Sequence, residues 1–417
     1  MGEKDWRYSD RYIKVLDGIR AIAILLIAWY HIWQQSWLQP IKEVEWLSVF
    51  HCNSINFDWL VRTGFEMVDM MLLLSGFCLF LPYARSMVYG VEEPNIKEFY
   101  KKRVARILPS YLVAILVAFI VAVSNGEYAD STEMWGDLLP HLFFGHTFWE
   151  QSYIYSKLNG VLWTLAVEVQ FYLIFPFVAK VFKRWMCQTY FVMVAISWMF
   201  INWGIVDRIP TEQYSMWINQ LPAFLAVYAN GMLAAFVVVK LTQIFNQFLE
   251  GREVLAREKE KKQIGYFFTL LLVISLFVYY KLMNELAYNE NGNLWQITNR
   301  FEVSVVYAVF LVACVFAVPV IQKVFGNVVT KFLSGISFQL YIWHQFISIQ
   351  LKNNHVPYWE GEQPPNITGD QAWMWQYFLL CWGCAFLVAI VATYLIERPC
   401  AKWILNGKKL FLKKQEK

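Results

Sequence analysis

Arg20 and His31 are ionisable residues in an apolar segment that is long enough to cross a membrane. Ionisable groups within membrane helices are costly, and they are therefore functional candidates. Eleven residues make about three helical turns, so both side chains should point the same way, roughly 16 Å apart along the helix axis. A guanidinium can bind an anionic donor, and an imidazole can transfer protons near neutral pH. The structural alternative is a snorkelling arginine and a histidine that is only hydrogen-bonded between helices.

Two carboxylates in other apolar segments are candidates to orient the His31 imidazole, as the acid does in a catalytic triad. Asp69 precedes the run MMLLLSGFCLF, and Glu168 lies in WTLAVEVQFYLIFP. If both segments run inward from the outer face, both carboxylates lie near the depth of His31. We therefore expect His31, Glu168 and Asp69 to form the catalytic group. For each acid the alternative is an ion pair with Arg62 or a protonated, hydrogen-bonded carboxyl.

Three further residues are expected to contact substrate. Trp163 and Tyr172 share roughly one helical face with Glu168, and Tyr172 lies one turn beyond it. His344, in the segment SGISFQLYIWHQF, should lie in the middle or outer half of the membrane. We interpret His344 as a packing or substrate-binding residue, with a second acid–base role as the alternative.

The segment FYKKRVARILPSY precedes the third apolar run and carries Arg103 and Arg106, one helical turn apart. Together with Lys101 and Lys102 they form a compact cationic patch that could bind phosphates. On spacing alone, an ordinary anchor at the cytoplasmic face of the membrane is favoured over a binding site.

Composition places the chain in a membrane. Of its 417 residues, 58% are hydrophobic and only 16% are charged, compared with roughly 25% charged residues in an average soluble domain. Ten apolar segments are long enough, or nearly so, to span about 30 Å of hydrocarbon. We predict an all-α polytopic transmembrane bundle with spans at about 13–34, 61–84, 107–124, 161–179, 189–206, 222–240, 263–283, 300–321, 332–351 and 374–396. The stretch 138–148 is apolar but too short to span, so it is interpreted as an interfacial or re-entrant piece.

The distribution of Lys and Arg predicts the orientation. With both termini in the cytoplasm, most of the 36 basic residues fall on the inner side. We predict one transmembrane domain over residues 1–400 and a basic cytoplasmic tail over 401–417, in a multi-pass protein of the cell membrane. Cys381 and Cys384 form a C-x-x-C, but within a predicted helix and with no second cysteine pair. We therefore expect no metal site, and no nucleic-acid partner.

Six of these segments, taken in order along the chain, resemble acyltransferase family 3, the bacterial membrane O-acyltransferases of surface sugars and peptidoglycan. Arg20 and His31 match the R-x10-H motif of that family, and Arg103 and Arg106 match its R-x-x-R motif. The chain differs modestly from the family, because Glu168-Val169-Gln170 replaces a tandem acid and MVDMML replaces GVDLFF. The segments are DGIRAIAILLIAWYH (17–31), VDMMLLLSGF (68–77), FYKKRVARILPSY (99–111), WTLAVEVQFYLIFP (163–176), SFQLYIWH (337–344) and IERP (396–399).

The resemblance implies a reaction. The donor would be an acyl-CoA, usually acetyl-CoA, bound from the cytoplasm, and the acceptor would be a hydroxyl of an envelope glycan or a lipid-linked sugar. His31 would be the catalytic base, and Arg20, Arg103 and Arg106 would bind the CoA. Some family members carry an appended extracytoplasmic esterase-like domain, so here such a partner would be a separate protein.

Two other functions are compatible with buried charges in a helical bundle. A membrane transporter of a small solute could use the same residues, although the sequence has no inverted repeat and no pair of broken helices. A structural scaffold would tolerate substitution at both Arg20 and His31.

Overall fold

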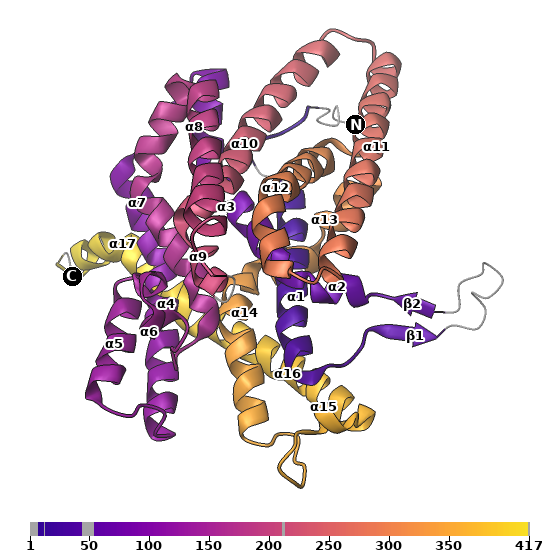
Figure 1. Ribbon diagram of the computed structural model, residues 1–417. Coiled ribbons are helices and arrows are strands. Elements are labelled where there is room, and N and C mark those ends of the chain that lie inside the picture. Colours follow the sequence, from indigo (N-terminus) through magenta and orange to yellow (C-terminus); the bar gives the residue numbers. More distant parts are fainter. Residues whose placement is uncertain (1–6, 12, 44–53, 211–212, 416–417) are drawn as a thin grey trace.

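The computed structural model describes residues 7–11, 13–43, 54–210 and 213–415 and consists of a bundle of long helices (Figure 1). Each of the ten predicted apolar segments lies largely within one of these long helices, as the prediction of a polytopic all-α bundle requires. The long helices are α1 (Val15–Ser36), α3 (Met67–Tyr89), α4 (Ile96–Ser124), α7 (Trp163–Arg184), α8 (Met186–Met199), α10 (Leu221–Leu249), α11 (Val254–Ala287), α12 (Gly292–Phe316), α14 (Val328–Asn353) and α16 (Gln371–Ala392).

Shorter elements connect or extend the long helices. A two-stranded antiparallel hairpin follows α1, with Ile41 paired to Asn56, and the π-helical segments η5 and η7 continue α8 and α16. The shorter elements are β1 (Ile41–Glu43), β2 (Ser54–Asn56), α2 (Asp58–Arg62), η2 (Gly64–Glu66), α5 (Ser131–Leu142), η3 (His146–Phe148), α6 (Glu150–Tyr153), η4 (Gly160–Leu162), η5 (Phe200–Val206), α9 (Tyr214–Trp217), α13 (Pro319–Phe325), α15 (Pro365–Thr368), η7 (Thr393–Glu397) and α17 (Arg398–Gln415).

Nine helical stretches in the described part of the chain are long and apolar enough to cross a membrane. The helix α14 is as long as these, but it carries polar residues, among them Gln339 and His344, that lower its hydropathy. Both of these side chains are buried inside the bundle. The protein is therefore a polytopic membrane protein, while the cytoplasmic placement of its termini stays a prediction.

The helix α4 begins well before the predicted span at 107. The side chain of Asn95 accepts hydrogen bonds from the backbone N–H groups of Lys97 and Glu98, which caps the helix at Ile96. Because the basic segment belongs to the first turns of α4, Arg103 and Arg106 lie on a continuous helix. The hydropathy pattern missed this extension, since its residues are charged.

Close packing through small residues holds the centre of the bundle. A Cβ atom on Gly231 of α10 would lie 2.2 Å from the carbonyl oxygen of Leu73 on α3, so glycine alone permits this approach. The neighbouring helices α1 and α14 also pack against each other, whereas much of the surface of α8 and α11 is exposed. The site residues lie on α1, α3, α4, α7 and α14.

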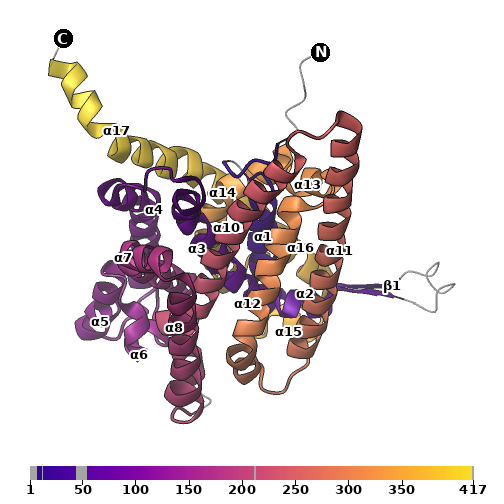
Figure 2. The ribbon, with the colours of Figure 1, turned by 90° about the horizontal axis from the view of Figure 1, so that it is seen from above.

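The last helix, α17, extends away from the bundle (Figure 2). Near its middle, the backbone oxygen of Leu405 accepts a hydrogen bond of 2.8 Å from Nζ of Lys101 on α4. The basic tail and the basic start of α4 therefore lie on the same side of the molecule. The division into a domain over 1–400 and a tail over 401–417 stays a prediction.

Candidate active site

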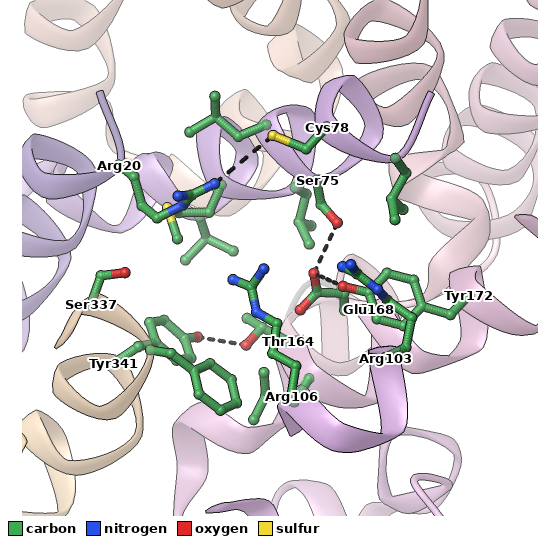
Figure 3. Close-up of a pocket in the computed structure, with 17 residues that line it drawn as sticks. Arg20, Ser75, Cys78, Arg103, Arg106, Thr164, Glu168, Tyr172, Ser337 and Tyr341 are labelled. Atoms are coloured by element: carbon green, nitrogen blue, oxygen red, sulfur yellow. Dashed lines mark hydrogen bonds between the residues drawn. The ribbon is translucent and has the colours of Figure 1, made fainter. Parts of the chain in front are cut away.

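A cavity lies between α1, α3, α4, α7 and α14 (Figure 3). It contains about 730 Å³ of space free of protein atoms and is partly open to its surroundings. Five elements that are distant in sequence thus contribute to one site. The polar or ionisable lining residues are Arg20, Ser75, Cys78, Arg103, Arg106, Thr164, Glu168, Tyr172, Ser337 and Tyr341.

Three arginines give the cavity its charge. Arg20 donates hydrogen bonds to Ser334 Oγ at 3.2 Å and to Cys78 Sγ at 3.9 Å. The guanidinium of Arg103 stands over the Tyr172 ring, 5.6 Å from its centroid. Arg106 extends into the space between Arg20 and Glu168 (Figure 3).

None of these arginines forms an ion pair with a carboxylate among the described residues. Among the described residues that line the cavity, Glu168 is the only acidic one, so the formal charge of this lining is positive. Guanidinium groups without an acidic partner favour an anion that accepts several hydrogen bonds, such as a phosphate.

Glu168 is held by two hydroxyl groups. Ser75 on α3 donates a hydrogen bond of 2.8 Å to Oε1, and Tyr172, one turn further along α7, donates to the same oxygen. The second oxygen, Oε2, has no hydrogen-bond partner in the part of the chain that the structure describes. The carboxylate is therefore fixed in orientation, with one oxygen left available.

Tyr341 of α14 lines the cavity on the side of His344. Its hydroxyl donates to the backbone oxygen of Val161 at 3.1 Å and accepts from Oγ1 of Thr164 at 2.8 Å. The Tyr341 ring lies 5.8 Å from the ring of His344, measured between centroids. The cavity thus adjoins His344 through this tyrosine.

His31 and His344 form a pair between α1 and α14. Nδ1 of His31 lies 3.0 Å from Nε2 of His344, and the ring centroids are 4.9 Å apart. His344 is completely buried, whereas His31 is partly exposed. Neither histidine is part of the cavity lining itself.

The structure does not place either predicted acid against His31. Asp69 forms an ion pair with Arg300 of α12, Oδ2 to Nε at 3.0 Å, and Glu168 is engaged by Ser75 and Tyr172. His344 occupies the position expected of an orienting acid. The sequence could not distinguish these arrangements, because helix periodicity gives the face of a residue but not its neighbouring helix.

Trp163 lies outside the cavity lining, although Glu168 and Tyr172 are part of it. Its ring stacks on Phe224 of α10, with centroids 5.9 Å apart. Instead, the cavity is lined in the first turn of α7 by Thr164 and Leu165. In the structure, therefore, Trp163 is a packing residue between α7 and α10.

Sequence reasoning missed several polar residues of the site and its surroundings. Ser75 and Cys78 lie one turn apart on the cavity face of α3, and Tyr341 lies one turn before His344. The i,i+3 spacing from His344 could have indicated Tyr341. Outside the cavity lining, Arg300 was also missed as the partner of Asp69; it lies at the edge of an apolar segment and is 2% exposed.

A cationic cavity and a histidine pair inside a bundle of membrane-crossing helices define a membrane protein that can bind an anion and transfer protons. Residues 13–398 match the family described as Acyltransferase domain. The chain belongs to this family, acyltransferase family 3, and the resemblance noted from the sequence is confirmed.

Curated relatives carry related names. The chain is 29% identical to O-acetyltransferase OatA of Staphylococcus aureus (strain NCTC 8325 / PS 47) over 216 residues, which cover 47% of this chain and 31% of the relative. It is 28% identical to Peptidoglycan O-acetyltransferase OatA of Listeria monocytogenes over 192 residues, covering 43% and 26%. Putative peptidoglycan O-acetyltransferase YrhL of Bacillus subtilis is 29% identical over 182 residues, covering 40% and 23%.

The chain matches less than a third of the length of these relatives. No solved structure matches it significantly.

Proposed function

We propose that this protein is a membrane O-acetyltransferase that moves an acetyl group from cytoplasmic acetyl-CoA to a hydroxyl of an envelope glycan. The observation that carries the proposal is the cavity in which Arg20, Arg103 and Arg106 form no ion pair with a carboxylate of the described residues, adjoining the pair of His31 and His344. Family membership supports acyl transfer. The names of the relatives favour O-acetylation, with peptidoglycan as the acceptor.

The three arginines bind the phosphates of the donor in this proposal. Charge-assisted hydrogen bonds from guanidinium groups to phosphate oxygens are among the stronger polar contacts in proteins. The guanidinium groups of the three arginines come from α1 and α4, on the side of the membrane that is predicted to be cytoplasmic. The pantetheine arm then extends along the cavity past Glu168 and Tyr341 toward the histidines.

His31 acts as the general base. It takes the proton of the acceptor hydroxyl while the hydroxyl oxygen attacks the thioester carbonyl carbon, and the carbon–sulfur bond then breaks. The CoA thiolate leaves and receives the proton from the imidazolium of His31, so the step is balanced in protons and charge. In a second route consistent with the same residues, His31 accepts the acetyl group before the acceptor hydroxyl displaces it.

The acceptor reaches His31 from the side opposite the donor. His31 is eleven residues further along α1 than Arg20, and its ring is partly exposed. We also propose that an extracytoplasmic esterase-like protein is a partner that completes transfer to the glycan.

A transfer assay with purified protein tests the proposal. Acetyl-labelled acetyl-CoA is incubated with the protein and peptidoglycan fragments, and acetylated fragments are detected by mass spectrometry. The expected result is label in an O-acetyl ester together with saturable binding of acetyl-CoA. A protein that transports a solute but neither binds acetyl-CoA nor releases CoA would contradict the proposal and favour a carrier.

A further inference from the structure

The hydrogen bonds of His344 determine which of its nitrogens carries the proton. Nδ1 of His344 lies 3.0 Å from the backbone oxygen of Leu340. A carbonyl oxygen only accepts hydrogen bonds, so Nδ1 must be the protonated nitrogen. In the neutral ring, Nε2 of His344 is then an acceptor.

His31 faces two acceptors with a single nitrogen. Its Nδ1 lies 3.0 Å from the backbone oxygen of Ile27 and 3.0 Å from Nε2 of His344. A proton on Nδ1 satisfies this arrangement, because one N–H can be shared between the two acceptors. The opposite tautomer would set the lone pair of Nδ1 against two other lone pairs and leave both contacts without a donor, which is unfavourable.

The other nitrogen of His31 is available for chemistry. Nε2 has no hydrogen-bond partner among the described residues, and it is not among the buried polar atoms that lack a partner. Tyr30 contacts the ring edge-on, with centroids 5.0 Å apart. With the proton on Nδ1, the unprotonated Nε2 is the atom that can accept a proton.

We propose that His344 is a positioning residue that, together with the backbone oxygen of Ile27, keeps His31 in the Nδ1–H tautomer and thereby makes Nε2 the base. This inference rests on the proposed function, in which His31 takes a proton from the acceptor. His344 performs with a neutral ring the orienting task that a carboxylate performs in a catalytic triad. When Nε2 accepts the proton, the Nδ1–H of the imidazolium stays bonded to His344, and the ring returns to the same tautomer after it releases the proton.

Nitrogen-15 NMR of ring-labelled histidine in lipid bilayers tests the tautomer directly. The chain has six histidines, and the spectrum of His31→Ala identifies the signals of His31. The expected result is a protonated Nδ1 and an unprotonated Nε2 in the resting protein. In His344→Phe, which cannot accept a hydrogen bond, Nδ1 of His31 loses one of its two acceptors, so we expect the fraction of the Nε2–H form to rise above that of the wild type, while the backbone oxygen of Ile27 still favours Nδ1–H. A wild-type His31 protonated at Nε2 would overturn the inference.

Kinetics provide a second, independent measurement. His344→Phe should lower kcat on the order of tenfold or more, while the KM for acetyl-CoA stays unchanged, because the donor site does not include His344. His344→Gln supplies an amide oxygen near the place of Nε2 and should restore most of the rate. Equal impairment in folded Phe and Gln variants would contradict a positioning role. The NMR result does not depend on activity, so Nδ1–H in a protein without transferase activity would refute the proposed function alone.

Discussion

Oδ2 of Asp69 lies 3.0 Å from Nε of Arg300, and both side chains are almost completely buried. The guanidinium also donates to the backbone oxygen of Ile218 at 2.8 Å and stands over the Phe224 ring, 4.1 Å from its centroid. This arrangement links α3 to α12 and to the segment before α10. The role that the structure supports for Asp69 is therefore to hold the bundle together.

Removing one partner of this pair should destabilise the fold. Asp69→Ala leaves Arg300 buried without its counter-ion, which we expect to cost about 3–5 kcal/mol. Unfolding of the purified protein in detergent measures the loss. The matched control is the double variant Asp69→Leu with Arg300→Met, which should recover much of the stability together with transferase activity. A double variant that is stable but inactive would indicate that Asp69 or Arg300 takes part in catalysis and would contradict a purely structural role for the pair.

The arginines of α4 should affect donor binding rather than the chemical step. Arg103→Gln or Arg106→Gln removes charge-assisted hydrogen bonds to phosphate, so the Kd of acetyl-CoA should rise about 10- to 100-fold. Titration calorimetry or binding of labelled acetyl-CoA measures the effect. Lys102→Gln is the matched control, because Lys102 lies in the same basic segment but pairs with Glu98 at 3.3 Å. An equal rise in Kd for Lys102→Gln would mean that Arg103 and Arg106 act only through the overall positive charge of the segment and do not bind the phosphates specifically.

Ser75 and Tyr172 should prevent the carboxylate of Glu168 from pairing with the arginines of the cavity. Their hydroxyls hold Oε1 of Glu168, and without them the carboxylate is free to pair with Arg106. We therefore expect Ser75→Ala with Tyr172→Phe to weaken acetyl-CoA binding, and the additional change Glu168→Gln to restore it. The comparison of double and triple variants in the same binding assay checks this coupling. No restoration in the triple variant would show that Glu168 has another role.

The stability of the segment around α5 should depend on pH. The rings of His141 and His146 stack with centroids 4.0 Å apart, and both are buried outside the membrane-spanning helices. Burial lowers the pKa of His146 well below its ordinary value, and the neighbouring His141 lowers it further. The unfolded chain therefore binds a proton below about pH 6.5 that the folded protein does not bind, and stability falls as pH decreases.

His146→Phe retains a stacking ring without the titrating group. In this variant the free energy of unfolding should depend less steeply on pH, by up to about 1.4 kcal/mol per pH unit between roughly pH 6 and pH 4.5. The free energies of unfolding of the wild type and of His146→Phe are measured and compared over this pH range. Identical slopes would mean that His146 is not the group responsible.

Hydropathy and charge were sufficient to predict the bundle and the membrane class, because each apolar run is long enough to specify a helix. The association of Arg20 with Arg103 and Arg106 was predictable only through the family motifs. The pairings His31–His344 and Asp69–Arg300 were not predictable, because they depend on which helices are neighbours in space. Likewise, the early start of α4 depends on the capping contacts of Asn95, which hydropathy does not register.

In the proposed function, His31 is the base for a reaction that moves an acetyl group from one side of the bilayer to the other. The most direct measurement uses proteoliposomes with labelled acetyl-CoA inside and a peptidoglycan fragment outside, and compares wild type with His31→Ala. We expect the variant to fold, to bind acetyl-CoA normally and to transfer acetyl about 10²- to 10⁴-fold more slowly. A folded His31→Ala protein that acetylates the outer acceptor at nearly the wild-type rate would contradict the account.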